Sequence, residues 1–318
     1  MASARNRPPI DPALGLDLVA TRTLQGTPAS VTVVIPAHNE QDTITEVVAE
    51  ARRGLSLLGV PGKVIVCASD CTDDTAKLAA DAGALVVPAP RGKGAAVSMG
   101  VAAADGEIIC LIDGDMRYFG TRPLVTILAE PILHGTADAT ISDLYWRPLY
   151  PQLWLYGFFA PLAGALFPEL LAKAGSTPWS GQRAAIRKLW PDALPAGFTV
   201  DLELLFHWNQ HATRLRPVLA DDWVNPQRPK PGLMEQEFKL IIRHALKQGR
   251  IRPGSQQALH RWFDSIHHMM ATYRPDEDDP AEFEHQLLAH SLAELHRQAD
   301  WQPQQRRARR DDSYGRTP

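Results

Sequence analysis

Cysteine is scarce in this chain of 318 residues, which contains only Cys67, Cys71 and Cys110. The count is odd, and Cys67 and Cys110 stand inside apolar runs, so the sequence argues against a disulfide-stabilised fold and indicates reduced thiols, as in the cytosol. Cys67 and Cys71 could form half of a metal clip. Because no second Cys or His pair lies nearby, packing as small apolar side chains is the favoured interpretation.

Strong charge of one sign and long apolar runs are also missing. The 33 basic and 36 acidic residues leave a formal net charge of -3, which gives no support to general nucleic-acid binding. Residues Met1–Pro9 are polar and do not resemble a secretory signal peptide. No stretch reaches the roughly 18 apolar residues of a membrane span, and the nearest, Leu153–Leu166, is interpreted as a buried helix pair. We therefore expect a cytoplasmic protein.

The first 120 residues alternate between short apolar runs and helical patterns. The expected strands are 31–35, 63–68, 84–87 and 107–112, and the expected helices between them are 42–58, 73–82 and 94–104. This alternation predicts a doubly wound α/β unit with a parallel sheet. In such sheets ligands bind beyond the carboxyl ends of the strands.

The pattern changes after residue 120, where helices predominate. The expected helices are 123–133, 149–174, 199–211, 238–248, 255–272 and 279–301, and the expected strands are 137–144 and 215–223. Residues 176–185 are expected to form a loop that leads into a strand or a helix. The segment 1–29 is interpreted as a flexible lead and the basic segment 302–318 as a disordered tail.

Two polar motifs follow the first two expected strands. Ile35–Glu40 (IPAHNE) combines an amide and a carboxylate that can meet a nucleoside, and Ala68–Thr75 (ASDCTDDT) carries small hydroxyl and carboxylate groups that suit a base or a ribose. Each motif can equally be the capped start of the next helix, with Thr72 as the cap in the second case. Taken singly, neither motif decides between these interpretations.

A glycine-rich turn, Arg91–Gly94 (RGKG), precedes the third expected helix. Its glycines would let the backbone approach an anion, the helix N-terminus favours negative charge, and Lys93 adds a positive charge. The spacing is not that of a P-loop, so a kinase is not indicated. A plain turn is the alternative.

The motif Asp113-Gly114-Asp115 follows the fourth expected strand. Two carboxylates beside a buried apolar strand are costly unless a cation neutralises them. Oxygen ligands select hard cations such as Mg²⁺ or Mn²⁺, and such an ion can stabilise the charge of a departing diphosphate. An acidic turn without a metal is the alternative.

Together these four motifs, in this order and at this spacing, resemble the GT-A glycosyltransferases. Within them the sequence is most similar to the retaining family of glucosyl-3-phosphoglycerate and mannosyl-3-phosphoglycerate synthases. The similarity extends to Asp143–Leu149 (DLYWRPL), Trp179–Arg187 (WSGQRAAIR) and Gly197–Leu205 (GFTVDLELL), and it covers roughly residues 30–235.

The resemblance implies the fold and the division of the chain. The expected fold is a Rossmann-like α/β GT-A fold with a mostly parallel sheet and a helical C-terminal extension. The resemblance implies five segments, which are the lead (1–29), a nucleotide-sugar binding half (30–120), an acceptor-binding half (121–235), C-terminal helices (236–301) and the tail (302–318).

The resemblance also implies roles for single residues. The donor would be bound by residues of the first four motifs, namely Pro36, Ala37, Glu40, Ser69, Lys93, Asp113 and Gly114. The catalytic set would be Lys93, Asp115 and Asp201, with Asp201 near the transferred sugar. The acceptor would be bound by Gly181, Arg183, Arg187 and Arg228. The metal, Mg²⁺ or Mn²⁺, would be held by Asp113, Asp115 and Asn225.

Two positions depart from the pattern of the resembled family. Asn225, in Trp223–Arg228, stands where that family places a histidine ligand of the metal, and Ala68 stands where many relatives carry an aspartate. The implied reaction transfers a hexose, with retention, from UDP-glucose first or GDP-mannose next to a small anionic acceptor such as 3-phosphoglycerate.

Two other functions stay open. A polyprenyl-phosphate glycosyltransferase shares the early motifs, and its aromatic stretch 145–167 would touch a membrane surface. A nucleotide-sugar binding protein without catalysis is the second alternative. The C-terminal helices are also compatible with a homodimer.

Overall fold

The computed structural model describes residues 30–117, 120–143, 152–175, 180–220 and 232–298. Within these ranges the chain forms a seven-stranded sheet in the order β3-β2-β1-β4-β6-β5-β7. Its strands are β1 (Val31–Ala37), β2 (Gly62–Ser69), β3 (Leu85–Ala89), β4 (Ile108–Leu111), β5 (Ala139–Asp143), β6 (Arg183–Ile186) and β7 (Leu215–Leu219).

The sheet is mostly parallel, as the sequence predicts. β1 to β4 pair in parallel, β5 pairs in parallel with β7, and β6 alone runs antiparallel to its neighbours β4 and β5. The carboxyl ends of the six other strands therefore meet at one edge, where β6 begins. The register places Arg183 of β6 beside Leu111 of β4 and Ile141 of β5. The two halves expected from the sequence thus share one sheet.

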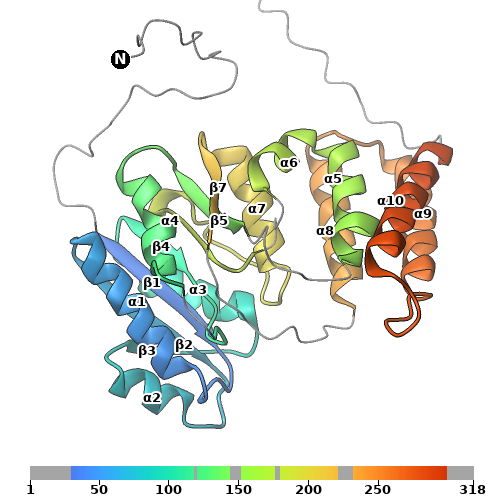
Figure 1. The fold of residues 1–318 in the computed structure, drawn as a ribbon. Coiled ribbons are helices and arrows are strands. Elements are labelled where there is room, and N and C mark those ends of the chain that lie inside the picture. Colours follow the sequence, from blue (N-terminus) through green and yellow to red (C-terminus); the bar gives the residue numbers. More distant parts are fainter. Residues whose placement is uncertain (1–29, 118–119, 144–151, 176–179, 221–231, 299–318) are drawn as a thin grey trace, which may run out of the picture.

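Helices cover both faces of the sheet (Figure 1). On one face lie α1 (Ile44–Leu58), α2 (Thr75–Asp81) and α4 (Leu124–Leu133), and on the other lie α3 (Lys93–Ala103) and α7 (Val200–His211). Each face of the sheet has its own apolar core. Neighbouring residues of a strand contribute to different cores, because successive side chains of a strand point to opposite faces. Val33 and Ile35 pack with α1, whereas Val34 packs with α3. The continuous apolar runs of the sequence have this physical cause.

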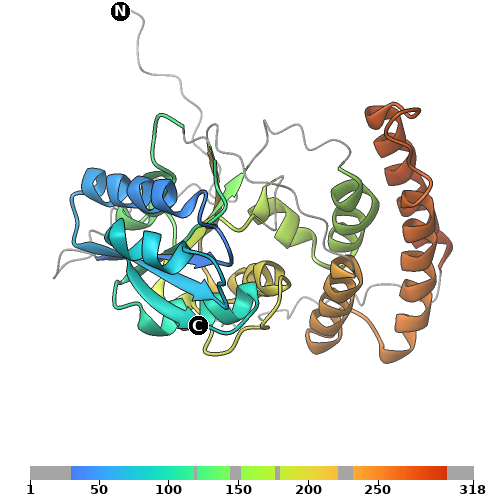
Figure 2. The ribbon, with the colours of Figure 1, turned by 90° about the horizontal axis from the view of Figure 1, so that it is seen from below.

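A second group of helices stands beside the sheet (Figures 1 and 2). It combines the C-terminal helices α8 (Leu233–Lys247), η4 (Pro253–Ser255), α9 (Gln256–Met270) and α10 (Pro280–Arg297) with three elements that precede β6 in the sequence, the π-helical turn η2 (Trp154–Phe159), α5 (Ala160–Leu166) and α6 (Pro168–Ala174). Its centre is aromatic. Phe158 stacks on Trp262 at 6.3 Å and meets Phe238 and Phe263 edge-on. Within the described part of the chain, no helix combines the length and apolar character needed to span a membrane.

Most expected elements are present, with shifted ends. The expected helix 149–174 is interrupted at Phe167, since Pro168 begins a new helix and cannot donate a backbone hydrogen bond. α8 begins at Leu233, five residues before its expected start, because Gly232 takes a left-handed conformation with φ of 74° and lets the chain turn into the helix. The expected lead 1–29 and tail 302–318 lie outside the described residues.

Candidate active site

The polar motifs of the sequence meet at the carboxyl edge of the sheet. Pro36 and Ala37 end β1, Ser69 ends β2, and Asp113 comes two residues after β4. Because these strands are neighbours and parallel, residues up to 77 positions apart in the sequence are brought to the same edge. The β1–β4 ladder ends at Val34, two residues before Pro36, which has no N–H to donate.

The loops after β1 and β2 are tied to each other. His38 Nδ1 donates to the carbonyl of Ser69 at 2.6 Å, and Asn39 Oδ1 accepts the amide of Thr72 at 2.8 Å. Asn39 and Asp70 have φ of 56° and 49°, a left-handed conformation that Asn and Asp adopt more readily than most residues. Thr72 therefore joins the two loops and is not the cap of α2, which begins at Thr75.

Glu40 and Ser69, two predicted donor contacts, also have structural partners. The amide of Glu40 donates to Thr75 Oγ1 at 2.7 Å, and its side chain is buried. Ser69 Oγ donates to the carbonyl of Pro90 at 2.8 Å and accepts the amide of Gly92 at 3.1 Å. The Ser69 hydroxyl thereby fixes the glycine-rich turn against the end of β2.

The N-terminus of α3 differs from the expected anion cradle. The amides of Gly94 and Ala95 donate to the carbonyls of Gly197 and Ala196 at 3.2 and 3.0 Å. A Cβ atom on Gly94 would lie 1.8 Å from the carbonyl oxygen of Pro195, so glycine is needed for this close approach. The expectation that these amides face an anion is wrong, because the loop before α7 already caps the helix.

Lys93 lies between two carboxylates. Its Nζ atom is 2.9 Å from Asp113 Oδ1 and 2.7 Å from Asp201 Oδ2, and its side chain is only 12% exposed. Burial lowers the pKa of Lys93, but the charges of Asp113 and Asp201 and the hydrogen bonds to them raise it by more. The lysine is therefore a fixed cation that joins the loop after β4 to the first turn of α7.

Gln182 is a residue of the site that the sequence analysis missed. Its Nε2 donates to Asp113 Oδ2 at 2.7 Å, and its Oε1 accepts the amide of Asp113 at 2.8 Å. The side chain is fully buried. With Lys93 on the other oxygen, both oxygens of the Asp113 carboxylate have a side-chain partner. A glutamine has no distinctive signal in one sequence, so only the pairing of β6 with β4 reveals it.

Asp115 lies on the same turn as Asp113 and is half-buried. The turn is held by Thr43 Oγ1, which donates to the carbonyl of Gly114 at 2.7 Å. Among the described residues, no group of three or more His, Cys, Asp or Glu side chains is arranged to hold a metal ion. Asn225 and Arg228, predicted to bind metal and acceptor, lie outside the described residues.

Gly181 lies against the Lys93 cluster. A Cβ atom at this position would be 2.4 Å from Asp113 Oδ2 and 2.6 Å from Lys93 Nζ, closer than such atoms can approach. The turn that contains Gly181 is held by Ser180, whose hydroxyl hydrogen-bonds that of Ser142 at 2.6 Å. The predicted acceptor glycine therefore forms a wall of the site.

Arg183 and Arg187, the two predicted acceptor clamps within the described residues, do not lie where an acceptor could bind them. Arg183 is fully buried, and its guanidinium donates to the carbonyls of Ser180 and Asp201. Arg187 is exposed at the other end of β6, where its amide donates to the carbonyl of Glu107, just before β4. The reason is the antiparallel direction of β6, which carries Arg187 away from the edge that holds Asp113.

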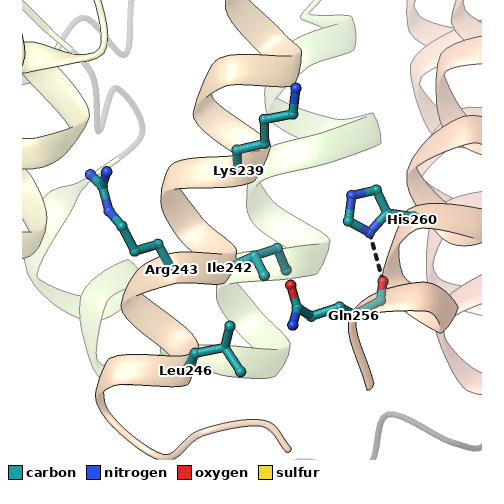
Figure 3. Close-up of a pocket in the computed structure, with 6 residues that line it drawn as sticks. All are labelled: Lys239, Ile242, Arg243, Leu246, Gln256 and His260. Atoms are coloured by element: carbon teal, nitrogen blue, oxygen red, sulfur yellow. Dashed lines mark hydrogen bonds between the residues drawn. The ribbon is translucent and has the colours of Figure 1, made fainter. Parts of the chain in front are cut away.

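A pocket of about 320 Å³ lies between α8 and the start of α9, among Lys239, Ile242, Arg243, Leu246, Gln256 and His260 (Figure 3). Its two cations are already paired, Lys239 with Glu235 at 2.6 Å and Arg243 with Glu203 at 3.0 Å. None of the predicted site residues lines this pocket.

Comparison with known proteins gives a family match for part of the chain. Residues 32–157 match Glycosyl transferase family 2. Glucosyl-3-phosphoglycerate synthase of Mycobacterium tuberculosis is 34% identical over 200 residues, which cover 55% of this chain and 60% of that protein. The enzyme of that name from Mycolicibacterium paratuberculosis is 32% identical over 199 residues, which cover 55% of this chain and 59% of the relative. The alignments thus span less than two thirds of these curated relatives.

Solved structures give the same similarity. The crystal structure of Mycobacterium tuberculosis glucosyl-3-phosphoglycerate synthase with Mn²⁺, UDP-glucose and phosphoglyceric acid superposes with a TM-score of 0.58 and 29% identity, over 68% of this chain and 80% of that one. A complex of the same enzyme with Mn²⁺, UDP and phosphoglyceric acid gives a TM-score of 0.57 and 28% identity, over 71% and 84%. The chain thus has the GT-A fold of these structures, matches Glycosyl transferase family 2 over residues 32–157, and resembles the glucosyl-3-phosphoglycerate synthases in sequence and structure.

Proposed function

We propose that this protein is a metal-dependent glycosyltransferase that moves a hexose from a nucleotide sugar to a small anionic acceptor, with retention at the anomeric carbon. UDP-glucose is the first donor to test and GDP-mannose the second, and 3-phosphoglycerate is the first acceptor. The observation that carries the proposal is the cluster of Lys93, Asp113 and Asp201 at the carboxyl edge of the sheet, beside Asp115. The similar enzyme that binds Mn²⁺, UDP-glucose and phosphoglyceric acid supports this choice of ligands.

The residues on the turn after β4 fit a hard divalent cation. Asp113 and Asp115 offer carboxylate oxygens, the donor type that Mg²⁺ and Mn²⁺ prefer. Because Lys93 and Gln182 already bind the two oxygens of Asp113, we assign the direct contact with the metal to Asp115 first and to Asp113 second. When bound, the ion would stabilise negative charge on the diphosphate of the donor. Asn225 remains a proposed further ligand.

The other residues act by binding and orientation. The loops that contain Pro36, Ala37, Glu40 and Ser69 would hold the nucleoside, and their mutual hydrogen bonds keep them in place before the donor arrives. Lys93 supplies a buried positive charge for the departing phosphate groups. Asp201 Oδ2 binds the ammonium group of Lys93, which fixes the direction of the side chain and stabilises its positive charge.

On the acceptor side, the proposal uses Gly181 and Arg228. Gly181 lies directly against Asp113 and Lys93, where a side chain would displace one of them, and we assign its backbone to the wall that the acceptor would contact. Of the three arginines expected to clamp an anionic acceptor, Arg228 is the one that this proposal keeps. Arg183 and Arg187 are not assigned this role, because Arg183 is fully buried and Arg187 lies at the end of β6 that is far from Asp113.

The membrane-surface alternative is disfavoured by where the aromatic residues lie. Phe158, Phe159 and Phe167 are at most 1% exposed and pack inside the protein, so these rings do not form an exposed apolar surface. The alternative of a non-catalytic binding protein predicts that the donor binds but is neither transferred nor hydrolysed. Measuring hydrolysis of the donor with added Mn²⁺ separates it from an enzyme.

The proposal is tested with a panel of donors and acceptors. UDP-glucose, GDP-glucose and GDP-mannose are incubated with 3-phosphoglycerate or glycerol 3-phosphate, with Mn²⁺, with Mg²⁺ or with EDTA. We expect a product from one donor, formed only with a divalent cation, and an α-anomeric signal in its proton NMR spectrum from an α-linked donor. A panel without any product would contradict the proposal, and a β-anomeric product would contradict retention.

A further inference from the structure

Arg183 is the largest charged side chain that is fully buried in the described part of the protein. It is the first residue of β6 and lies between Leu111 of β4 and Ile141 of β5. A buried guanidinium is costly unless hydrogen bonds and opposite charges compensate it. Arg183 lies at the edge of the sheet that carries the site, so the groups that compensate its buried charge belong to that site.

Hydrogen bonds of the Arg183 guanidinium connect two walls of the site. Nε donates to the carbonyl of Ser180 at 2.9 Å, Nη2 donates to the same carbonyl, and Nη1 donates to the carbonyl of Asp201 at 2.8 Å. One wall is the turn at Gly181, and the other is the first turn of α7. A planar group with several fixed donors is suited to hold two carbonyls at once.

The charge of Arg183 also faces the carboxylate of Asp201. Asp201 Oδ1 is buried and has no hydrogen-bond partner, and it lies 3.8 Å from Nη2 of Arg183. The other oxygen, Oδ2, holds Lys93 at 2.7 Å. The guanidinium also lies over the ring of Trp208, with its central carbon 5.6 Å from the ring centroid. Arg183 thus packs against Trp208, and it lies near the Asp201 oxygen that does not hold Lys93.

We propose that Arg183 is a positioning residue for the transfer reaction, which sets the Asp201 carboxylate against Lys93 and the Gly181 turn against Asp113. It does not touch substrate. This inference rests on the proposed function for its kinetic consequence, but its structural consequence, the fixed position of Lys93, is independent of any activity. It also explains why an arginine that the sequence suggests as an acceptor clamp is buried.

The kinetic test compares Arg183→Met and Arg183→Lys with the unchanged protein. Met keeps most of the volume and removes the charge and all donors, whereas Lys keeps the charge but cannot bridge two carbonyls in one plane. We expect kcat to fall about 100-fold in R183M and less in R183K, the size of effect known for small misplacements of catalytic groups. KM for the donor should change little, because the nucleoside loops do not contact Arg183. A rise in the KM for the donor with kcat unchanged, so that kcat/KM falls only through KM, would overturn the proposal.

A double-mutant cycle with Asp201→Asn separates positioning from a general effect on the fold. If Arg183 acts through Asp201, R183M should lower kcat much less in the D201N background than in the unchanged protein. Independent, multiplicative losses in the two variants would overturn the proposal. Arg187→Met, an exposed arginine of the same segment, is the matched control and should leave kcat unchanged.

A measurement without turnover completes the test. The Nζ protons of Lys93, bound to two carboxylates and nearly buried, should give a protected signal in ¹H–¹⁵N NMR spectra of the ammonium groups, identified by its loss in Lys93→Met. R183M should lose this signal or shift it strongly, and R183K should shift it less. If R183M does not fold, R183K decides the question. An unchanged Lys93 signal overturns the positioning role, whereas a protein with the expected signal but no transfer activity contradicts only the proposed function.

Discussion

Lys93 and Asp201 are 108 positions apart in the sequence, yet their charged groups are in contact at 2.7 Å. Lys93 is the first residue of α3, which follows the turn after β3, and Asp201 lies in the first turn of α7. The contact exists because the carbonyls of Ala196 and Gly197 cap α3 and so bring the start of α7 against the start of α3. This contact joins the donor-side motifs to the acceptor side of the chain.

Removal of Lys93 should destabilise the protein strongly. In Lys93→Met the carboxylates of Asp113 and Asp201 would lose their shared cation while staying nearly buried. Breaking a buried ion pair from one side costs about 3–5 kcal/mol. We expect a loss of this size in the free energy of unfolding, measured with urea, together with loss of transfer activity.

The matched control for Lys93 is Lys63→Met. Lys63 pairs with Asp105 at 2.9 Å, but the Asp105 side chain is 76% exposed, so water replaces the lost partner. The control should unfold at nearly the same urea concentration as the unchanged protein. Equal losses in the two variants would show that the Lys93 cluster is not a buried ion network.

A methyl group at position 181 should disturb the site more than the fold. The Cβ atom of Gly181→Ala would meet Asp113 Oδ2 and Lys93 Nζ at distances that force one of them to move. We expect kcat to fall by at least about tenfold, because catalytic groups tolerate little displacement. Steady-state kinetics and the melting temperature should be measured on the same preparations.

Gly197→Ala is the matched control for this substitution. A Cβ atom on Gly197 meets no atom within 4 Å, although its carbonyl caps α3 in the same region. This variant should keep its activity. If Gly181→Ala is as active as Gly197→Ala, the close approach at Gly181 has no role in the site.

The sequence predicts the fold well because its signals are local. Apolar runs without alternation identify the four parallel strands, and the motifs after them are placed correctly by the rule that ligands gather at carboxyl ends. The roles of Gln182 and Arg183 could not be found in this way, because they depend on β6 being inserted antiparallel between β4 and β5. The same insertion moves Arg187 to the opposite end of the sheet.

The glycine-rich turn shows a different limit of sequence analysis. Glycines before a helix are compatible with an anion site and with close packing of backbone, and the sequence does not distinguish them. In this protein Gly94 allows the carbonyl of Pro195 to approach, and the amides that follow are already bonded. Only the contact between α3 and the loop before α7, distant in sequence, decides between the two.

Stability should fall in acid partly through Glu203 on α7. Burial raises the pKa of Glu203, but the hydrogen bond and charge of His244 and the charge of Arg243 lower it by more, so its pKa in the folded protein lies below the ordinary 4.5. A lowered pKa gives stability that is present above the ordinary value and is lost as the pH falls through the folded-state value. The difference in unfolding free energy between the unchanged protein and Glu203→Gln should therefore be fully present above pH 4.5 and shrink as the pH falls below it.

Urea unfolding at several pH values checks this expectation. Glu46→Gln, on the exposed face of α1, makes the same change in charge and is the control. A difference between Glu203→Gln and the unchanged protein that stays constant from pH 7 to pH 3.5 would contradict the assigned role of His244 and Arg243.

The most direct test of the central claim is transfer of labelled glucose by the unchanged protein and by Asp115→Ala. Both are incubated with UDP-[¹³C]glucose, 3-phosphoglycerate and Mn²⁺, and the product is followed by mass spectrometry. We expect a glucosylated product from the unchanged protein, no product with EDTA, and no product from a folded Asp115→Ala. Equal turnover by the two proteins, or turnover unaffected by EDTA, would contradict a metal-dependent transfer that uses Asp115.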